Sequence, residues 1–347
     1  MKQMVLTGIR HMELREVEKP RITGDRDVLI RVTKVGVCGS DVHYYTTGRI
    51  GSQIVDYPFA VGHECAGVVE ETGSATTRVR AGDSVAIDPA MPCFQCDQCA
   101  AGRFHTCRRL RFLGCPGQAE GCLGEFLVMP ETSVYPLPAG MTQDEAVISE
   151  PLAIGVYAVR QSGEIRERKI GILGAGPIGL SVLLPAKAWG AASIYVTDKI
   201  EARLALARRL GADWTGNPDA MDVAAGINAE EPLQLDVAYE CCGQQDAIDN
   251  AIDILKPGGK LMVIGIPEAD RLSFSIDKMR RKEITIVNVR RQNECVDAAL
   301  DLLQTAGNDA SAMITHRFPF SQTPEAFDLV SERRDGVVKA MIEFGDD

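Results

Sequence analysis

The feature that most constrains the fold is a glycine-rich turn, Gly174-Ala175-Gly176-Pro177-Ile178-Gly179. An apolar run at residues 170–173 precedes it and predicts a buried strand, while helical periodicity continues after it to Trp189. Glycines in such a turn let the backbone bend sharply and approach a pyrophosphate, which the N-terminus of the next helix attracts. The stretch therefore predicts a dinucleotide-binding strand–turn–helix unit.

An acidic residue at the end of the next strand indicates which dinucleotide is bound. Residues 193–197 predict that strand, which ends in Asp198, 19 residues after Gly179. A carboxylate at this position accepts hydrogen bonds from ribose hydroxyls and repels the 2′-phosphate of NADP, so we expect NAD. Two nearby cations, Lys199 and Arg203, leave the strictness of this preference open.

The segment after Asp198 continues as alternating strands and helices. Residues 235–240, 260–265 and 283–287 predict strands, which implies a parallel doubly wound sheet. Ligands bind at the carboxyl ends of such strands. The predicted cofactor-binding residues are Gly174, Gly176, Pro177, Ile178, Gly179, Asp198, Lys199, Arg203, Cys242 and Gly265.

A separate metal signal lies in a loop with the spacing C-x2-C-x2-C-x7-C. Its cysteines are Cys93, Cys96, Cys99 and Cys107. Four thiolates can surround one tetrahedral ion and leave no open position, so we expect a structural zinc site. An iron–sulfur cluster fits less well, because its fourth cysteine usually stands in a C-x3-C-P context, and here Arg108 follows. Four unrelated surface cysteines are the remaining alternative.

The first ninety residues read as short β segments cut by turns. Residues 27–32, 65–70 and 84–87 predict strands, and no helix-length periodic stretch interrupts them. The chain has 33 glycines and only 5% aromatic residues, which suits a turn-rich β domain beside an α/β domain. We therefore expect an antiparallel β domain at the beginning of the chain.

Charge and hydropathy exclude several classes of partner. The formal net charge is −11, and no basic stripe interleaved with aromatic residues is present, so nucleic-acid binding is not expected. No apolar stretch approaches the ~20 residues that span a bilayer, and the charged N-terminus lacks the apolar run of a signal peptide. We expect a cytoplasmic protein that acts on a small molecule.

Metal-binding side chains also occur early in the chain. Cys38, His63 and Glu64 offer a thiolate, an imidazole and a carboxylate, which suggests an open zinc site. Adjacent residues in a flat strand point to opposite faces, so His63 and Glu64 can share a metal only if the backbone turns, and Gly62 permits that turn. Glu150, near the start of a predicted helix, is either a favourable charge at the helix N-terminus or part of this site.

The sequence resembles the zinc-containing medium-chain dehydrogenase/reductase family over nearly its whole length, and its polyol (sorbitol-like) dehydrogenase branch most closely. The stretches that carry the resemblance are residues 38–44 (CGSDVHY), 48–51 (GRIG), 62–64 (GHE), the four cysteines Cys93, Cys96, Cys99 and Cys107, residues 150–152 (EPL), 174–180 (GAGPIGL) and Asp198. The resemblance implies an α/β fold in two parts. A catalytic domain with a co-chaperonin-like antiparallel β fold would cover residues 1–152 and 290–347, and a Rossmann domain that binds NAD would cover residues 153–289.

The resemblance assigns the catalytic zinc to Cys38 and His63, with Glu64 as the third ligand in this branch and Glu150 close by. One thiolate, a neutral imidazole and one carboxylate neutralise Zn²⁺, whereas Glu150 as a further ligand would make the site anionic. We therefore expect Glu64 to bind the metal and Glu150 to stand behind a water molecule, although the reverse assignment stays open. Zinc would act as a Lewis acid on the substrate hydroxyl, and NAD would accept the hydride.

Ser40 and His43 offer a path for the departing proton; the alternative for His43 is a strand-loop histidine packed on the ribose. The branch has an arginine at the position of Arg290, near the substrate. The next residue, commonly aromatic in the family, is here Arg291, which suggests a substrate with a carboxylate; otherwise Arg291 points outward.

The resemblance thus implies a zinc-dependent oxidoreductase that transfers hydride from a secondary alcohol of a polyol or sugar acid to NAD, in a homo-oligomer (dimer or tetramer). The alternatives are a threonine- or simple-alcohol dehydrogenase of the same family and a zinc- and dinucleotide-binding protein without turnover. The intact set of donor residues argues against the last alternative.

Overall fold

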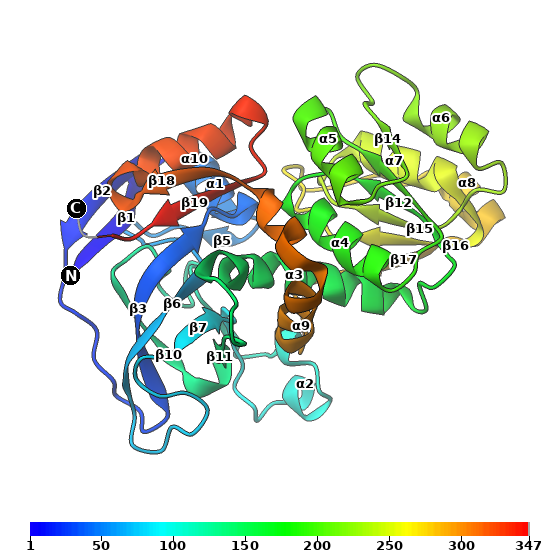
Figure 1. The fold of residues 1–347 in the computed structure, drawn as a ribbon. Helices are drawn as coiled ribbons and strands as arrows, with labels where there is room; N and C mark the ends of the chain where they lie inside the picture. Colours follow the sequence, from blue (N-terminus) through cyan, green and yellow to red (C-terminus); the bar gives the residue numbers. More distant parts are fainter. Residues whose placement is uncertain (346–347) are drawn as a thin grey trace. The chain divides into compact units, whose positions relative to one another are not determined.

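The computed structural model describes residues 1–345, except for the side chains of residues 306–309. The chain divides into two compact units (Figure 1). The first unit comprises Met1–Glu150 and Ala299–Asp347, and the second comprises Pro151–Ala298. The last segment of the chain thus belongs to the first unit, and the unit boundaries lie near, but not at, the predicted domain boundaries.

The first unit is built on a seven-stranded sheet with the order β11-β7-β6-β3-β19-β18, in which β10 also pairs with β3. Its strands are β3 (Asp27–Gly36), β6 (Glu64–Thr72), β7 (Ser84–Ile87), β10 (Phe126–Pro130), β11 (Val134–Pro136), β18 (Ile314–Pro319) and β19 (Lys339–Glu343). The pairings are antiparallel except for β18 with β19, which run parallel. The predicted antiparallel β domain is confirmed, and two strands from the end of the chain join it.

Strand β3 organises this sheet because it has three partners. One edge pairs with β6 along most of its length. The other edge is shared: residues 27–31 pair with β10, and residues 34–36 pair with β19. The early and late parts of the chain therefore meet along a single strand.

One prediction for this unit was wrong, because helix α1 (Gly39–Thr47) interrupts the β segments. It begins directly after Cys38 and ends at Gly48, whose φ of 70° closes the helix in the left-handed region. Its buried residues are Asp41, Tyr44 and Tyr45. Because a carboxylate and two tyrosines form the inward face, the apolar periodicity that signals a helix is missing from the sequence.

Helix α10 (Thr323–Ser331) packs against α1 and so ties the last segment to the first. The rings of Tyr45 and Phe327 lie 5.4 Å apart in an edge-to-face arrangement, and the Tyr45 hydroxyl donates to Asp328 at 2.8 Å. The remaining elements of this unit are β1 (Lys2–Gly8), β2 (His11–Glu16), β4 (Arg49–Ile50), β5 (Gln53–Ile54), β8 (Ala90–Met91), α2 (Asp97–Ala100) and β9 (Arg111–Phe112), together with short 3-10 turns.

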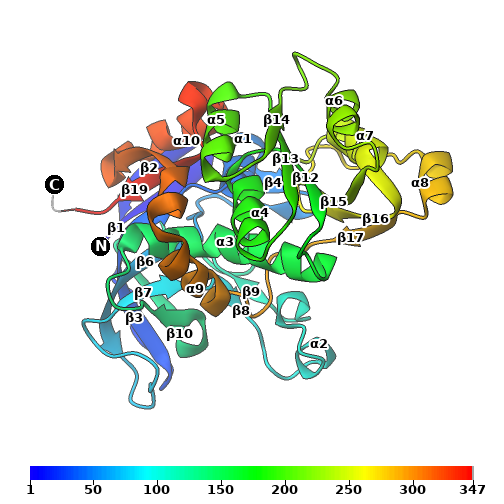
Figure 2. The same cartoon turned by 45° about the vertical axis from the view of Figure 1, so that its right-hand side comes forward.

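The second unit holds a six-stranded sheet with the order β14-β13-β12-β15-β16-β17, and all of its pairings are parallel (Figure 2). Its strands are β12 (Lys169–Leu173), β13 (Ser193–Thr197), β14 (Trp214–Gly216), β15 (Leu235–Glu240), β16 (Leu255–Val263) and β17 (Thr285–Asn288). Its helices are α4 (Pro177–Ala188), α5 (Glu201–Leu210), α6 (Val223–Glu230), α7 (Gln245–Ile254) and α8 (Ile276–Lys282). The predicted doubly wound parallel sheet is confirmed.

Two helices cross the unit boundaries, α3 (Gln143–Ser162) and α9 (Val296–Ala306). Helix α3 matters for the site, because its first half carries Glu150 within the first unit. Within the described residues, none of the helices combines the length and the apolar character needed to cross a bilayer.

Candidate active site

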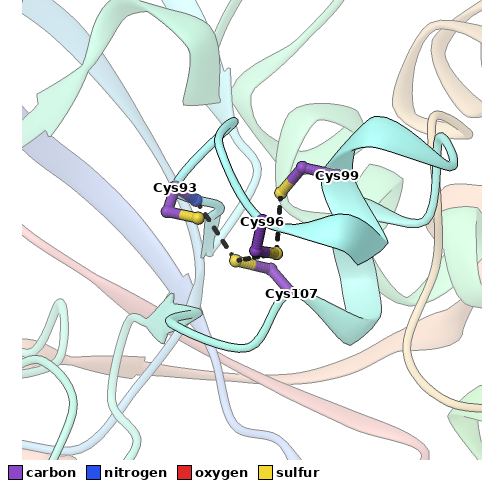
Figure 3. Close-up of side chains that lie close together, drawn as sticks. All are labelled: Cys93, Cys96, Cys99 and Cys107. Atoms are coloured by element: carbon purple, nitrogen blue, oxygen red, sulfur yellow. Dashed lines mark hydrogen bonds between the residues drawn. The ribbon is translucent and has the colours of Figure 1, made fainter.

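The four predicted cysteine ligands come together in the loop that contains α2 (Figure 3). All four sulfur atoms lie within 4.8 Å of one another. The Sγ of Cys96 is 3.6 Å from that of Cys99 and 3.8 Å from that of Cys107. Tetrahedral zinc with Zn–S bonds of about 2.3 Å places its sulfur ligands about 3.8 Å apart, so the arrangement fits this ion.

Backbone N–H groups stabilise negative charge on part of this loop, whereas burial raises the pKa of Cys99. The backbone N–H groups of Cys93 and Arg109 point at the Cys107 sulfur, at 3.3 and 3.4 Å. The backbone N–H of Gln95 is the main cause that lowers the pKa of Cys93 below its ordinary value. Four protein ligands fill the coordination sphere of the ion, so this loop is a structural zinc site rather than a reaction centre.

A second donor group consists of Cys38, His63 and Glu64, whose ligand atoms also lie within 4.8 Å of one another. Cys38 stands between the end of β3 and α1, and Glu64 is the first residue of β6. The pairing of Gly36 with Glu64 in the β3–β6 ladder brings the two segments together. His63 precedes the strand after Gly62, whose φ of 99° provides the predicted turn. Three donors leave a position open for a substrate.

Asp41 holds His63 in place, a role that the sequence analysis missed. Its Oδ1 lies 3.2 Å from Nδ1 of His63 and accepts the backbone N–H of Gly62 at 3.3 Å. Asp41 is completely buried on the inward face of α1. Histidines that bind metals commonly donate their second ring N–H to a carboxylate, so this contact leaves Nε2 for the metal. The signal was present in the sequence as an aspartate three residues after Cys38.

Two further charged side chains are buried at the same place. Glu64 forms an ion pair through Oε2 with Lys339 on β19, and each residue is 1% exposed. Glu150 is buried, and its Oε2 has no hydrogen-bond partner among the described residues. Burial raises the pKa of Glu150 above its ordinary value. The charges of His63, Glu64 and Lys339 act on the Glu150 carboxyl, so Glu150 lies beside the donor group, whereas the lysine was not anticipated.

The predicted proton path is only partly visible. The Ser40 hydroxyl lies 3.3 Å from the Cys38 sulfur, where it can donate to the thiolate. His43 lies within α1, so its expected place in a strand loop is wrong, while its packing on the ribose stays an alternative. A relay from Ser40 to His43 stays a prediction.

The glycine-rich turn in the second unit has the geometry of a dinucleotide site. Gly174 has a φ of 106°, and a Cβ on Gly179 would clash with the carbonyl oxygen of Gly174. The turn leads into the N-terminus of α4, where Pro177 and Ile178 form the first turn. The backbone N–H of Ala175 donates to Asp198 at 2.8 Å, which fixes the acid beside the turn.

The other predicted cofactor residues surround this turn or the neighbouring strand ends. Arg203 Nη1 lies 3.6 Å from the position that a Cβ on Gly176 would take. Lys199 instead pairs with Asp219 at 3.2 Å and Asp246 at 3.7 Å, both exposed.

Glu240, a buried acid that the sequence analysis did not single out, organises the end of β15. Its Oε1 accepts the backbone N–H of Cys242 at 2.7 Å. The backbone carbonyl of Glu240 accepts a hydrogen bond from the backbone N–H of Gly265 at 3.0 Å. The two predicted residues are therefore held together by Glu240.

Arg290 and Arg291 follow β17 in the second unit. Arg290 is exposed, and Arg291 is partly buried with a φ of 55°. Their predicted roles toward the substrate stay predictions.

Comparisons with known proteins agree with both halves of the chain. Residues 24–139 match the family described as alcohol dehydrogenase GroES-like domain, and residues 177–305 match the one described as zinc-binding dehydrogenase.

Among curated proteins, L-idonate 5-dehydrogenase from Vitis vinifera is 34% identical over 97% of this chain and 93% of its own length. Sorbitol dehydrogenase from Bacillus subtilis strain 168 is 32% identical over 99% of this chain and 97% of its own length. A solved oxidoreductase/dehydrogenase of unknown specificity from Escherichia coli superposes with a TM-score of 0.93 at 32% identity and covers 99% of both chains.

Proposed function

Because this chain belongs to the zinc-containing medium-chain dehydrogenase/reductase family, whose members are zinc-dependent NAD(P) oxidoreductases, we propose that it oxidises a secondary alcohol of a polyol or sugar acid with NAD. The observation that carries this proposal is the open donor group of Cys38, His63 and Glu64 with the buried Glu150 beside it. In the reaction the carbinol carbon gives a hydride to NAD, the hydroxyl proton leaves to solvent, and a ketone remains.

In this proposal Cys38, His63 and Glu64 hold the catalytic zinc. The bound ion supplies Lewis acidity, which makes the substrate hydroxyl a stronger acid. Asp41 keeps His63 in the tautomer that offers Nε2. The buried Oε2 of Glu150, which has no hydrogen-bond partner in the described part of the chain, is available to a water or a substrate hydroxyl next to the metal.

Ser40 and His43 take the proton toward solvent in this proposal. The Ser40 hydroxyl already lies beside the Cys38 sulfur, and His43 is one helical turn further along α1. Residues three apart on a helix share a face, so the two side chains can be linked by one water.

The second unit would bind NAD along the glycine-rich turn. The N-terminus of α4 attracts the pyrophosphate, and Asp198, fixed by the N–H groups of Ala175 and Ile200, accepts from the ribose hydroxyls. Lys199 is engaged by two carboxylates and is therefore a weak partner for a 2′-phosphate. We expect NAD to be preferred over NADP.

Arg291 supports a sugar acid as the substrate. The residue is partly buried, in contrast to Arg290, and a partly buried cation binds a carboxylate more strongly than an exposed one. Of the two curated relatives, one is named for an aldonate and the other for a neutral polyol, so the family accommodates both classes.

The test is a screen for NAD reduction with polyols, aldonates, threonine and simple alcohols, repeated with NADP. We expect the highest kcat/KM with an aldonate, and Arg291→Ala should lower it for aldonates and leave it unchanged for neutral polyols. Equal rates for aldonates and neutral polyols, both unaffected by Arg291→Ala, would rule out recognition of a substrate carboxylate by Arg291. NAD reduction by none of the compounds, in a chain that binds both zinc and NAD, would favour a protein without turnover.

We also infer from the family resemblance that the chain forms a homo-oligomer, a dimer or a tetramer. Light scattering coupled to size-exclusion chromatography measures the mass directly. A mass equal to that of one 37.6 kDa chain would contradict this inference.

A further inference from the structure

Lys339 is a buried cation that the proposed reaction does not use. It begins strand β19, is 1% exposed, and forms an ion pair with Oε2 of Glu64. Its ammonium also donates to the backbone carbonyl of Val37 at 3.3 Å. A lysine is almost never buried this completely unless it is paired, so its position next to a metal ligand calls for a physical account.

The backbone around the pair leaves the carboxylate little freedom. Strand β3 places Gly36 directly opposite Glu64, and a Cβ on Gly36 would touch Glu64 Oε2. The same strand also pairs Gly36 with Met341 on β19, two residues after Lys339. The glycine therefore provides the space in which the ammonium and the carboxylate meet.

The charges at the site explain what such a cation contributes. When it is bound, Zn²⁺ would neutralise the Cys38 thiolate and the Glu64 carboxylate. The Lys339 ammonium stands on the Oε2 side of Glu64 and adds a positive charge there. In the chain without metal, the same ammonium is the partner of Glu64, which would otherwise be a buried and uncompensated anion.

We propose that Lys339 is a positioning residue for Glu64: it holds one carboxylate oxygen, so that Glu64 offers the metal only the other, and it compensates the carboxylate when the metal is absent. This inference rests on the zinc site of the proposed function. It differs from a packing role, because a packing residue would stabilise the metal-free and the zinc-loaded chain equally.

The test replaces the ammonium by an uncharged side chain of similar length, Lys339→Met, and measures Tm in the zinc-loaded and the chelator-treated protein. We expect Tm of the metal-free variant to fall by about 10 °C relative to the metal-free parent, because a buried anion loses its partner. The zinc-loaded variant should lose much less, since the ion supplies positive charge to the same carboxylate. The rise in Tm on adding zinc is therefore larger in the variant than in the parent.

A second substitution separates charge from packing. In the double variant Lys339→Met/Glu64→Gln the uncompensated anion is gone, and we expect the metal-free Tm to recover most of the loss. Lys34→Met is the control, because Lys34 is a lysine of the same unit that is partly buried and paired with Asp144 at 2.7 Å and Glu343 at 2.8 Å, outside the metal site. It should lower Tm by the same amount with and without zinc.

The zinc content, measured together with Tm, distinguishes an error in the role of Lys339 from an error in the catalytic zinc site. Equal losses of Tm in both states of Lys339→Met, with no recovery on Glu64→Gln, would overturn the role of Lys339 and leave the zinc site intact. A parent chain that binds zinc only in the four-cysteine loop would instead overturn the catalytic zinc site itself.

Discussion

Asp41 decides which nitrogen of His63 is offered to the metal, so a single carboxylate controls one of three ligands. Replacing it by asparagine keeps the shape and removes the charge that favours the Nδ1–H tautomer. We expect Asp41→Asn to weaken zinc binding at the open site by about 10- to 100-fold, as found for other residues that hydrogen-bond to metal ligands. Competition with a chromogenic chelator measures this affinity.

The control is Tyr45→Phe, which removes a partly buried hydrogen bond from the same helix without touching the donor group. Its zinc affinity should equal that of the parent. An unchanged affinity in Asp41→Asn would mean that the imidazole is oriented by packing alone, for instance by Phe112, whose ring centroid is 5.5 Å from that of His63.

The donor residues were predictable from the sequence, but the side chains that hold them in place were not. Cys38, His63 and Glu64 are recognisable because few residue types bind zinc and the GHE stretch supplies a turn. Lys339 lies 275 residues away from Glu64, and no local pattern marks a lysine that will be buried. Asp41 was visible in the motif, yet its role depends on a helix that the apolar pattern did not predict.

At the scale of elements, the glycine-rich turn offers two substitutions with different expected effects. A Cβ on Gly179 would clash with Gly174 in the fold itself, whereas a Cβ on Gly176 meets nothing closer than Arg203 at 3.6 Å. We expect Gly179→Ala to lower Tm and Gly176→Ala to leave Tm unchanged while it weakens NAD binding at least tenfold, because that backbone approaches the pyrophosphate.

Calorimetry and quenching of protein fluorescence by NAD measure the two effects. Full NAD affinity in Gly176→Ala would show that the pyrophosphate does not lie over this residue. An unchanged Tm in Gly179→Ala would show that the turn relaxes to admit the methyl group.

The first turn of helix α3 is held by a network of ion pairs that should respond to acid. Burial would raise the pKa of Asp144, but hydrogen bonds from Arg317 and Lys34 outweigh it and hold the pKa below its usual range. A carboxyl whose pKa is lowered on folding stabilises the fold above its unfolded pKa of about 3.9, and the stabilisation is lost as pH falls through the folded pKa. Asp144→Asn should therefore cost about 2 kcal/mol at pH 7 and progressively less below about pH 4.

Urea unfolding of the parent and the variant at several pH values checks this dependence. Glu332→Gln is the control, since its exposed pair with Arg334 should contribute less than about 1 kcal/mol. A difference between parent and Asp144→Asn that stays constant from pH 7 to pH 3 would contradict the assignment.

Elements with a strong pattern were predicted well, and the exceptions have identifiable causes. Strands β7, β13 and β15 have the predicted bounds, because their apolar pattern is regular and turn residues flank them. Strand β16 begins at Leu255 rather than at residue 260, because Leu255 already pairs with Leu235 on β15. The register then shifts, and regular pairing resumes at Val237 and Lys260; Gly258, with a φ of 77°, lies within this irregular stretch.

At the scale of the whole molecule, the two units divide the chemistry, so damage to one zinc site should leave NAD binding intact. Cys107→Ser removes one of four ligands in the structural loop. We expect zinc content to fall from about two ions per chain to about one and Tm to fall, while NAD affinity, a property of the second unit, is unchanged. Elemental analysis and NAD titration test both parts.

Cys115→Ala is the appropriate control, because Cys115 is a buried cysteine of the same unit outside both donor groups. It should keep both ions. Loss of NAD affinity in Cys107→Ser would show that the fold of the second unit depends on the loop.

The order of strands in the first unit could not have been read from periodicity. Local pattern does not indicate that β19 pairs with β3, just over three hundred residues earlier in the chain. Only the resemblance to a known family implied that the last part of the chain returns to the first unit. Long-range pairing is set by the burial of whole faces, which a short window of sequence does not contain.

The ion pair between Glu64 and Lys339 also affects when the first unit can fold during synthesis of the chain. A ribosome that adds about 5 to 20 residues per second needs roughly 14 to 55 seconds to make the 275 residues between the two partners. During this interval the nascent chain carries the acid without its base, and β3 has no β19 on its edge. The first unit, whose synthesis begins first, is therefore the last to complete its sheet.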